Sequence, residues 1–213
     1  MSKWMQERRH DHYFRKAKQE GYRSRAAYKL KQINDRYHLI RRGDVVVDLG
    51  CAPGSWSQVA AELVGPEGRV IGIDLQPVDP IPGVTILQGD MLEPETVAVL
   101  EEALGGRQPN VVLSDMSPHI SGSHLRDHLQ SIALAEAAFE FAGQHLRPGG
   151  NVVLKVFEGE SLREFLRRVR SVFRFCKPHA PPASRRESSE VYVVGQGFRG
   201  GRKSLEIRGK DLT

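Results

Sequence analysis

Two charged side chains stand where short apolar runs are expected to form buried strands. Asp115 follows the run Val111–Ser114, and the Met-Ser-Pro sequence after it stops the strand. Lys155 interrupts the apolar run Asn151–Phe157, although Lys is rarely buried without a partner. Alternation along the strand could turn Lys155 to solvent, but parallel strands covered on both faces leave few solvated positions. We therefore expect Lys155 to pair with Asp115 at the carboxyl edge of the sheet, where α/β proteins bind ligands.

The sequence DLGCAPGSW, residues 48–56, has the composition of a nucleotide-binding turn. It follows one apolar run and precedes a helical one, with Gly50 and Gly54 where the chain must turn tightly beside a ligand. Pro53 lies inside the turn, which does not have the GxGxxG sequence, and no GxxxxGK[ST] is present. A dinucleotide-dependent dehydrogenase and a P-loop enzyme are both disfavoured.

Two more carboxylates end the next two expected strands. Asp74 lies about 20 residues after the turn, the place from which an acid holds ribose hydroxyls, and Asp90 could accept from an adenine amine. Either residue alone is better explained as a strand-end turn residue. Their succession after a glycine-rich turn favours an adenosine site. S-adenosylmethionine fits better than NAD, because no second mononucleotide-binding half is visible.

The surrounding pattern alternates strand and helix, which predicts an α/β fold with a parallel sheet. Strands are expected at 44–50, 69–75, 84–90, 110–115 and 151–157, and helices at 55–64, 96–104, 125–146 and 161–172. Residues 173–179 and 190–198 predict two further strands in an antiparallel hairpin at a sheet edge. In the loop between them, Ser184, Arg185 and Arg186 either grip RNA phosphates or only keep the hairpin soluble.

Charge is distributed unevenly along the 213 residues. Residues 1–42 hold thirteen Lys and Arg against four Asp and Glu, a net charge of +9, so the rest of the chain carries −4 of the total of +5. Aromatic residues are interleaved with these cations, a mixture that suits phosphates and unpaired bases. A solvated helix face is the simpler alternative, and the four acids argue against a transit peptide. We expect a basic RNA-binding extension at 1–42, a catalytic domain at 43–199 and a loosely held tail at 200–213.

Composition excludes several classes of protein. Hydrophobic residues make up 39% of the chain, and no run approaches the roughly 18 apolar residues that span a bilayer. Cys51 and Cys176 lie far apart, and no His or Cys spacing matches a metal site, so we expect neither a disulfide nor a metal. We therefore expect a reducing, cytoplasmic compartment. We also expect a monomer, since no amphipathic stretch is left over once helices cover the sheet.

The motifs together resemble the FtsJ/RrmJ-type ribosomal RNA 2′-O-ribose methyltransferases. The similarity extends from about Tyr13 to Phe198 and includes SRAAYKL, DLGCAPGSW, LSDMSP, VLKVF and KPHAPPASRRESSEVYVV in the family's order. It implies a Rossmann-like class I methyltransferase with a mostly parallel seven-stranded sheet. It also implies S-adenosylmethionine binding by Gly54, Trp56, Asp74, Asp90 and Asp115, and an active site of Lys29, Asp115, Lys155 and Glu190.

The resemblance implies methylation of a ribose 2′-hydroxyl, of a uridine, in large-subunit ribosomal RNA at a late stage of subunit assembly. Our hypothesis is that Lys155 accepts the hydroxyl proton, with burial and the neighbouring cation Lys29 favouring its neutral form. Asp115 would orient Lys155 and contact the methyl donor. Glu190 would hold the ribose or steady Lys29, unless it is only an exposed acid at a strand start. Methylation of tRNA remains an alternative, as does a non-catalytic RNA-binding assembly factor, although a pure binder needs no buried Lys.

Overall fold

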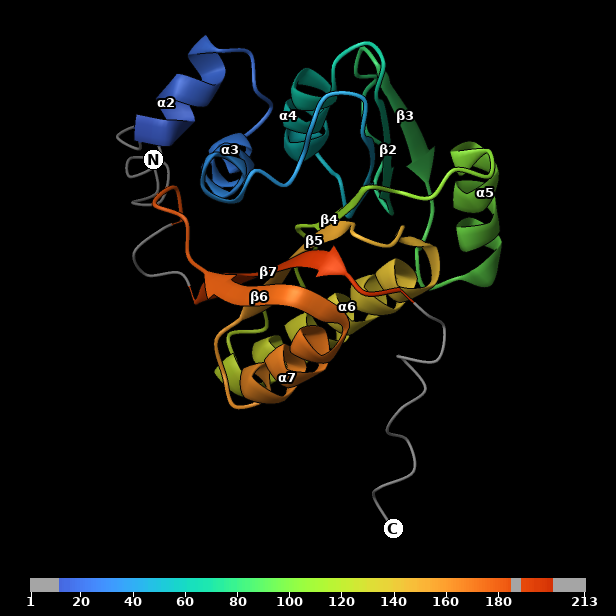
Figure 1. Cartoon of the computed structure of the whole chain (residues 1–213). Helices are drawn as coiled ribbons and strands as arrows, with labels where there is room; N and C mark the ends of the chain where they lie inside the picture. The colour runs from blue at the N-terminus through green and yellow to red at the C-terminus, as the bar shows by residue number, and fades with distance from the viewer. Residues whose placement is uncertain (1–11, 185–188, 201–213) are drawn as a thin grey trace.

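A seven-stranded sheet with helices on both faces forms the body of the protein (Figure 1). The computed structural model describes residues 12–184 and 189–200. The strands are β1 Val45–Leu49, β2 Arg69–Asp74, β3 Val84–Gln88, β4 Val111–Ser114, β5 Asn151–Phe157, β6 Phe173–His179 and β7 Glu190–Phe198. Their order is β3-β2-β1-β4-β5-β7-β6, with β1 to β5 parallel and β7 antiparallel to both its neighbours. The predicted fold class is confirmed.

Six helices are described, and two apolar clusters place them on the two faces of the sheet. They are α2 His12–Gln19, α3 Ala26–Tyr37, α4 Ser55–Val64, α5 Pro94–Leu104, α6 His124–His145 and α7 Leu162–Val172. Side chains of α5, α6 and α7 pack with one face of the sheet, and those of α2, α3 and α4 pack with the other. Successive residues of β1 alternate between the two clusters, which explains why its apolar run is continuous. No helix in the described part of the chain is both long and apolar enough to cross a membrane.

The basic N-terminal segment contains two helices that its charge pattern did not reveal. Ala27, Leu30 and Ile33 of α3 are fully buried and join the same apolar cluster as the neighbouring strands. The described part of this segment therefore packs into the core, while its role as an RNA-binding extension stays a prediction. Residues 1–11, Arg185, Arg186 and the expected tail from 201 onward lie outside the described residues.

One buried amide side chain fixes the end of α3. The Oδ1 atom of Asn34 accepts hydrogen bonds from the backbone N–H groups of Leu39 and Ile40, each at 3.0 Å. His38, which directly precedes Leu39, has a φ of 52°, in the left-handed region that often ends a helix. Because the following residues lead directly into β1, Asn34 sets the position of α3 relative to the sheet.

Replacing Asn34 by Ala should therefore destabilise the fold. Two buried N–H groups would lose their acceptor, and we expect a loss of about 2 to 4 kcal/mol in the free energy of unfolding. Urea denaturation of both proteins measures the change. The neighbouring exposed residue provides the control, since Asp35→Ala should alter stability by less than about 0.5 kcal/mol. Equal losses in the two variants would contradict this role of Asn34.

Candidate active site

The strand order creates a switch point between β1 and β4. From β1 the chain proceeds outward through β2 and β3 on one side, and from β4 through β5 on the other. At such a point the loops that follow the two strands diverge and leave a crevice for a ligand. Gly50 follows β1, and Met116 follows Asp115 at the end of β4. A side chain at Gly50 would overlap Met116, so the two loops approach as closely as glycine allows.

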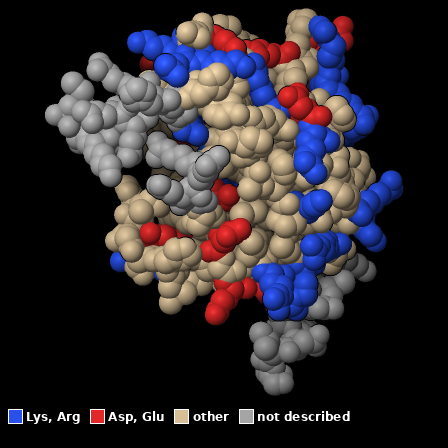
Figure 2. Space-filling model, turned by 90° about the vertical axis from the view of Figure 1, so that its left-hand side faces the viewer, with Lys and Arg blue, Asp and Glu red and all other residues tan. Residues whose placement is uncertain are grey.

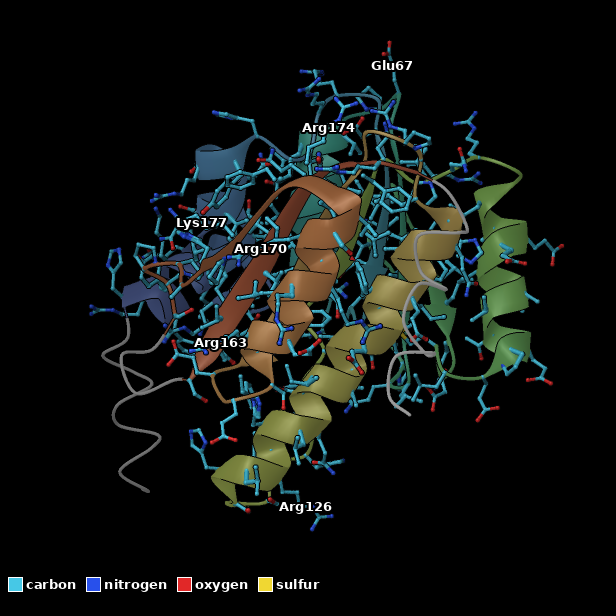
Figure 3. The ribbon with its side chains drawn as sticks, turned by 60° about the horizontal axis from the view of Figure 1, so that its bottom comes forward. Glu67, Arg126, Arg163, Arg170, Arg174 and Lys177 are labelled. Carbon is cyan, nitrogen blue, oxygen red and sulfur yellow. The ribbon has the colours of Figure 1, made fainter. Side chains whose placement is uncertain are left out.

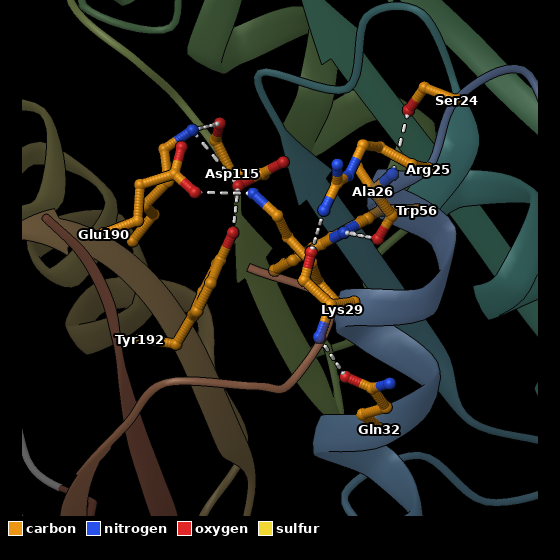
Figure 4. Close-up of polar contacts among 11 residues, drawn as sticks. Ser24, Arg25, Ala26, Lys29, Gln32, Trp56, Asp115, Glu190 and Tyr192 are labelled. Atoms are coloured by element: carbon orange, nitrogen blue, oxygen red, sulfur yellow. Dashed lines mark hydrogen bonds and ion pairs between the residues drawn. The ribbon is translucent and has the colours of Figure 1, made fainter. Parts of the chain in front are cut away.

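Three residues of the predicted active site, Lys29, Asp115 and Glu190, lie together at this edge (Figure 4), and the fourth, Lys155, contacts Asp115. Lys155 Nζ lies 3.1 Å from Asp115 Oδ1 and donates to the Asp115 carbonyl oxygen at 2.6 Å. Lys29 Nζ, from α3, lies 2.6 Å from Glu190 Oε2 at the start of β7. Only 9% of Lys29 and 6% of Lys155 is exposed. The expected pairing of Lys155 with Asp115 is thus present, and Lys155 does not point to solvent.

Tyr192 links the two pairs and was not predicted. It lies directly opposite Lys155 in the β5–β7 ladder, and its hydroxyl donates to Asp115 Oδ1 at 2.8 Å. Lys29 Nζ lies 5.7 Å from the centre of its ring. Because Tyr192 is two residues after Glu190, the period of a strand places both side chains on one face. The two-residue spacing from Glu190 was the feature of the sequence that could have revealed Tyr192 as a site residue.

Burial and neighbouring charges set the ionisation of this cluster. Burial alone would raise the pKa of Asp115, but Lys155, Lys29 and the Tyr192 hydroxyl together hold it below its ordinary value. Burial, and then the charges of Asp115 and Glu190, raise the pKa of Tyr192 well above its ordinary value. Asp115 is therefore a carboxylate and Tyr192 a neutral donor. The cluster offers a fixed negative charge and two amine groups to a polar substrate.

The glycine-rich turn is held from both sides. Asp74 Oδ2 accepts from the backbone N–H of Ala52 at 2.8 Å, which ties the turn to the end of β2. Arg23, in the connection between α2 and α3, donates to the carbonyl oxygens of Pro53 at 2.8 Å and Pro80 at 2.9 Å. A Cβ at Gly54 would lie 2.6 Å from Ile81 and 2.8 Å from Arg23. Sequence reasoning missed Arg23, because one Arg among many in a basic segment carries no sign of this role.

The other predicted donor-binding residues lie around the same edge. Asp74 Oδ1 accepts from the N–H of Gln76, and Asp90 Oδ1 accepts from the N–H of Leu92. Both side chains therefore act as strand-end turn residues, the alternative raised from the sequence. Each carboxylate can still accept further hydrogen bonds. The Trp56 side chain is 2% exposed, and its Nε1 donates to the Ala26 carbonyl oxygen at 2.9 Å. Trp56 can therefore face a ligand only through its backbone N–H, in the first turn of α4, where such groups lack helical partners.

Asp48, inside β1, is a further buried acid that we did not single out. It is 0% exposed, its Oδ2 accepts from Ser57 Oγ at 2.6 Å, and its Oδ1 has no hydrogen-bond partner among the described residues. Burial, opposed by the Ser57 hydrogen bond and reinforced by the charges of Asp115 and Asp74, raises the pKa of Asp48 to about 7. A charged residue in an apolar run was the same signal that marked Lys155. Asp48 is hence a proton-holding group directly beneath the turn.

No group of His, Cys, Asp or Glu side chains in the described ranges could hold a metal ion. The polar groups at this edge come instead from two Lys residues, three strand-end carboxylates, Glu190 and a glycine-rich turn. Such a set can bind an organic ligand along the turn and present amines and a carboxylate to a second substrate.

A parallel sheet in this order, with an antiparallel strand β7 inserted between β5 and β6, is typical of Rossmann-like methyltransferases. The chain belongs to the FtsJ-like methyltransferase family, whose sequence model matches residues 22–198. The resemblance found in its motifs is thereby confirmed, and the protein is an enzyme of the methyltransferase class.

Several similar proteins carry the name Ribosomal RNA large subunit methyltransferase E. The one from Methanothrix thermoacetophila is 52% identical, over 87% of this chain and 72% of its own. Those from Archaeoglobus fulgidus and Azoarcus sp. are 51% and 49% identical and are covered over 97% and 96% of their length. A crystal structure of a protein described as a ribosomal RNA methyltransferase from Plasmodium falciparum is 30% identical. It aligns with a TM-score of 0.76 over 84% of this chain and all of that one.

The buried acid beneath the turn gives a testable pH dependence. Because the pKa of Asp48 is raised from about 4 in the unfolded chain to about 7, folding takes up a proton between these values. The wild-type protein should therefore lose stability relative to Asp48→Asn as pH rises from 4 to 7, by at most about 1.4 kcal/mol per pH unit. Above about pH 8, where Asp48 is ionised in both states, the difference should stay constant.

Urea denaturation at intervals from pH 5 to pH 9 measures this difference. The exposed Asp79→Asn variant is the control and should follow the wild-type curve. If the Asp48→Asn and wild-type curves ran parallel across the whole range, Asp48 would not hold a proton in the folded protein.

Proposed function

We propose that this protein transfers a methyl group from S-adenosylmethionine to a ribose 2′-hydroxyl in large-subunit ribosomal RNA. The observation that carries the proposal is the buried contact of Lys155 with Asp115 beside the glycine-rich turn, with Lys29 and Glu190 adjoining it. The names of its relatives support large-subunit ribosomal RNA as the substrate. We also propose that it acts as a monomer in the cytoplasm.

The residues around the turn fit the proposed donor. Gly50 and Gly54 have no side chain and let neighbouring residues pack directly against the turn, and the backbone N–H of Trp56 stands at the N-terminus of α4, where a carboxylate is favoured. Asp74 and Asp90 would accept from the ribose hydroxyls and the adenine amine. Asp115, held as a carboxylate, would lie near the positive sulfonium. The donor supplies a methyl group that is already activated for transfer.

The chain's own task is then to align the hydroxyl and remove one proton. Correct positioning of two reactants can supply about 7 to 11 kcal/mol in favourable cases. Lys155, once it has released its ammonium proton, accepts the proton of the 2′-hydroxyl as the new oxygen–carbon bond forms. Asp115 and Tyr192 fix the position of that amine, and the Lys29–Glu190 pair contacts the ribose from the opposite side.

Two other functions compete with this one. A tRNA 2′-O-methyltransferase would use the same residues, because ribose chemistry and donor binding do not encode the RNA target. A non-catalytic assembly factor would not need two Lys residues that are less than a tenth exposed. The clustering of the four residues therefore favours an enzyme.

Transfer of labelled methyl groups distinguishes these functions. Purified large subunits, free ribosomal RNA and total tRNA would each be incubated with the enzyme and labelled S-adenosylmethionine, and then digested to nucleosides. We expect label in a 2′-O-methylated nucleoside from large-subunit RNA, and comparison of free RNA with subunits would show whether assembly is required. Label in tRNA alone would show that the enzyme methylates tRNA and not large-subunit ribosomal RNA. Donor binding without transfer to any RNA would support the assembly factor.

Substitution of Lys155 tests the proposed mechanism. Lys155→Met should lower the single-turnover rate of methyl transfer by at least about a hundredfold, because the proton acceptor is lost. Binding of S-adenosylmethionine, measured by calorimetry, should persist. Lys31→Met is the matched control, since Lys31 lies on the same helix as Lys29 but contacts Glu20, Glu62 and the Tyr22 ring instead of the four site residues. A near-normal rate in Lys155→Met would exclude Lys155 as the proton acceptor.

A further inference from the structure

A second concentration of positive charge lies around the edge strand β6. The segment from Leu162 to His179 contains six Lys and Arg against one Glu. Arg170 lies in the last turn of α7, Arg174 and Lys177 lie on β6, and Arg36 lies in the last turn of α3; all four are exposed. Phe175 is 42% exposed between Arg174 and Lys177. We call these five residues the β6 surface.

Figure 3 shows where three of these charges lie, and Figure 2 shows Lys and Arg over one face of the molecule as a whole. Figure 3 labels Arg170, Arg174 and Lys177 along α7 and the adjacent strand. Figure 2 shows Lys and Arg side chains following one another down the right-hand side of that view, with few acidic side chains between them. The positive charge therefore extends over a side of the molecule and is not confined to one helix.

These four cations differ from their charged neighbours on α7 in their ion pairing. Within residues 12–184 and 189–200, none of the four forms an ion pair with a carboxylate. Their neighbours on α7 do, since Arg167 pairs with Glu164 and Arg168 pairs with Glu136. Unneutralised cations repel one another, so a surface that keeps them is suited to an anionic partner.

Contacts join the end of α3 to β6. The ring of Tyr37 lies 6.0 Å from that of Phe175 and 5.4 Å from that of His179. Burial, followed by the charges of Arg36 and Lys177, holds the pKa of His179 below its ordinary value. Arg36 and Lys177 therefore act on the same site, although 141 positions of sequence separate them.

The β6 surface begins close to the reaction centre. His179 lies opposite Tyr192 in the β6–β7 ladder, and the Tyr192 hydroxyl contacts Asp115. From His179 the strand runs away from the cleft, and five residues at about 3.4 Å each place Arg174 about 17 Å along it. A chain whose ribose enters the cleft could therefore continue over this surface.

We propose that the β6 surface binds the phosphate backbone of the RNA whose ribose enters the active site. The proposal rests on the proposed function for its choice of polyanion. Arginine presents a planar fork that matches phosphate oxygens, and an exposed aromatic ring such as Phe175 can stack on an unpaired base. Basic residues on an edge strand also prevent strand-to-strand aggregation. That role does not account for Arg36 and Arg170, which lie on helices.

The test compares two double variants of the full chain. Arg174→Gln with Lys177→Gln removes two charges from the β6 surface. The control variant, Arg107→Gln with Arg167→Gln, also removes two exposed charges. Arg107 is far from β6 along the chain, and Arg167 is paired with Glu164. Binding of each protein to purified large-subunit ribosomal RNA is measured at a series of KCl concentrations, together with thermal stability and S-adenosylmethionine affinity.

The β6 variant should bind the RNA about tenfold or more weakly at 0.1 M KCl, with the salt dependence of log K reduced by roughly 2. The control pair should match the wild type, and neither pair should change stability or donor affinity. Equal RNA affinities and salt dependences for the two pairs would overturn the proposal. So would a loss of binding to assembled subunits with unchanged binding to free RNA, which would indicate a protein partner.

The outcomes for the β6 surface and for methyl transfer can be separated. If the wild-type protein binds RNA but transfers no label, the proposed function fails, while the comparison of the two variants still decides whether β6 contacts phosphates. If label is transferred and the two double variants bind RNA equally, the proposed function is supported and the proposed role of the β6 surface is overturned.

Discussion

The buried pair of Lys155 and Asp115 is the interaction on which the rest of the structure depends. Removing two charges from water is costly, and a pair of this kind persists only where further hydrogen bonds satisfy it. Here the Asp115 carbonyl oxygen and the Tyr192 hydroxyl provide these hydrogen bonds, and the charge of the nearby Lys29 adds to them. These groups come from β4, β7 and α3. The pair therefore requires that distant parts of the chain meet at one edge of the sheet.

Two features of the fold meet that requirement. The antiparallel strand β7 brings Tyr192 opposite Lys155 and Glu190 opposite Phe157, which a parallel strand arriving from the other end would not do. Helix α3 supplies Lys29, and Asn34 fixes where that helix ends. A segment that looks like a basic appendage in the sequence is thus part of the site.

The strands were predicted from their apolar runs. The Lys155–Asp115 pair was predicted because a charged residue in or directly after an apolar run is conspicuous. Tyr192 could not be found in this way, since Tyr is common in strands and its role depends on the register between β5 and β7. For Trp56 the sequence showed its position next to the turn but not the direction of its side chain. Tertiary packing directs that side chain toward Ala26. Helices α2 and α3 were concealed by the charges on their exposed sides.

Lys and Arg serve two opposite purposes in this protein, and burial separates them. In the cleft, Lys29 and Lys155 are buried and paired, so their charge is neutralised and their position is fixed. On the β6 surface, Arg174 and Lys177 are exposed and lack ion pairs with described carboxylates, so their charge remains available to a partner. A net charge summed over residues 43–213 conceals this difference, because acids elsewhere in the chain outweigh the local excess. A polyanion responds to charges within a Debye length, about 10 Å at 0.1 M salt, and so to the local excess.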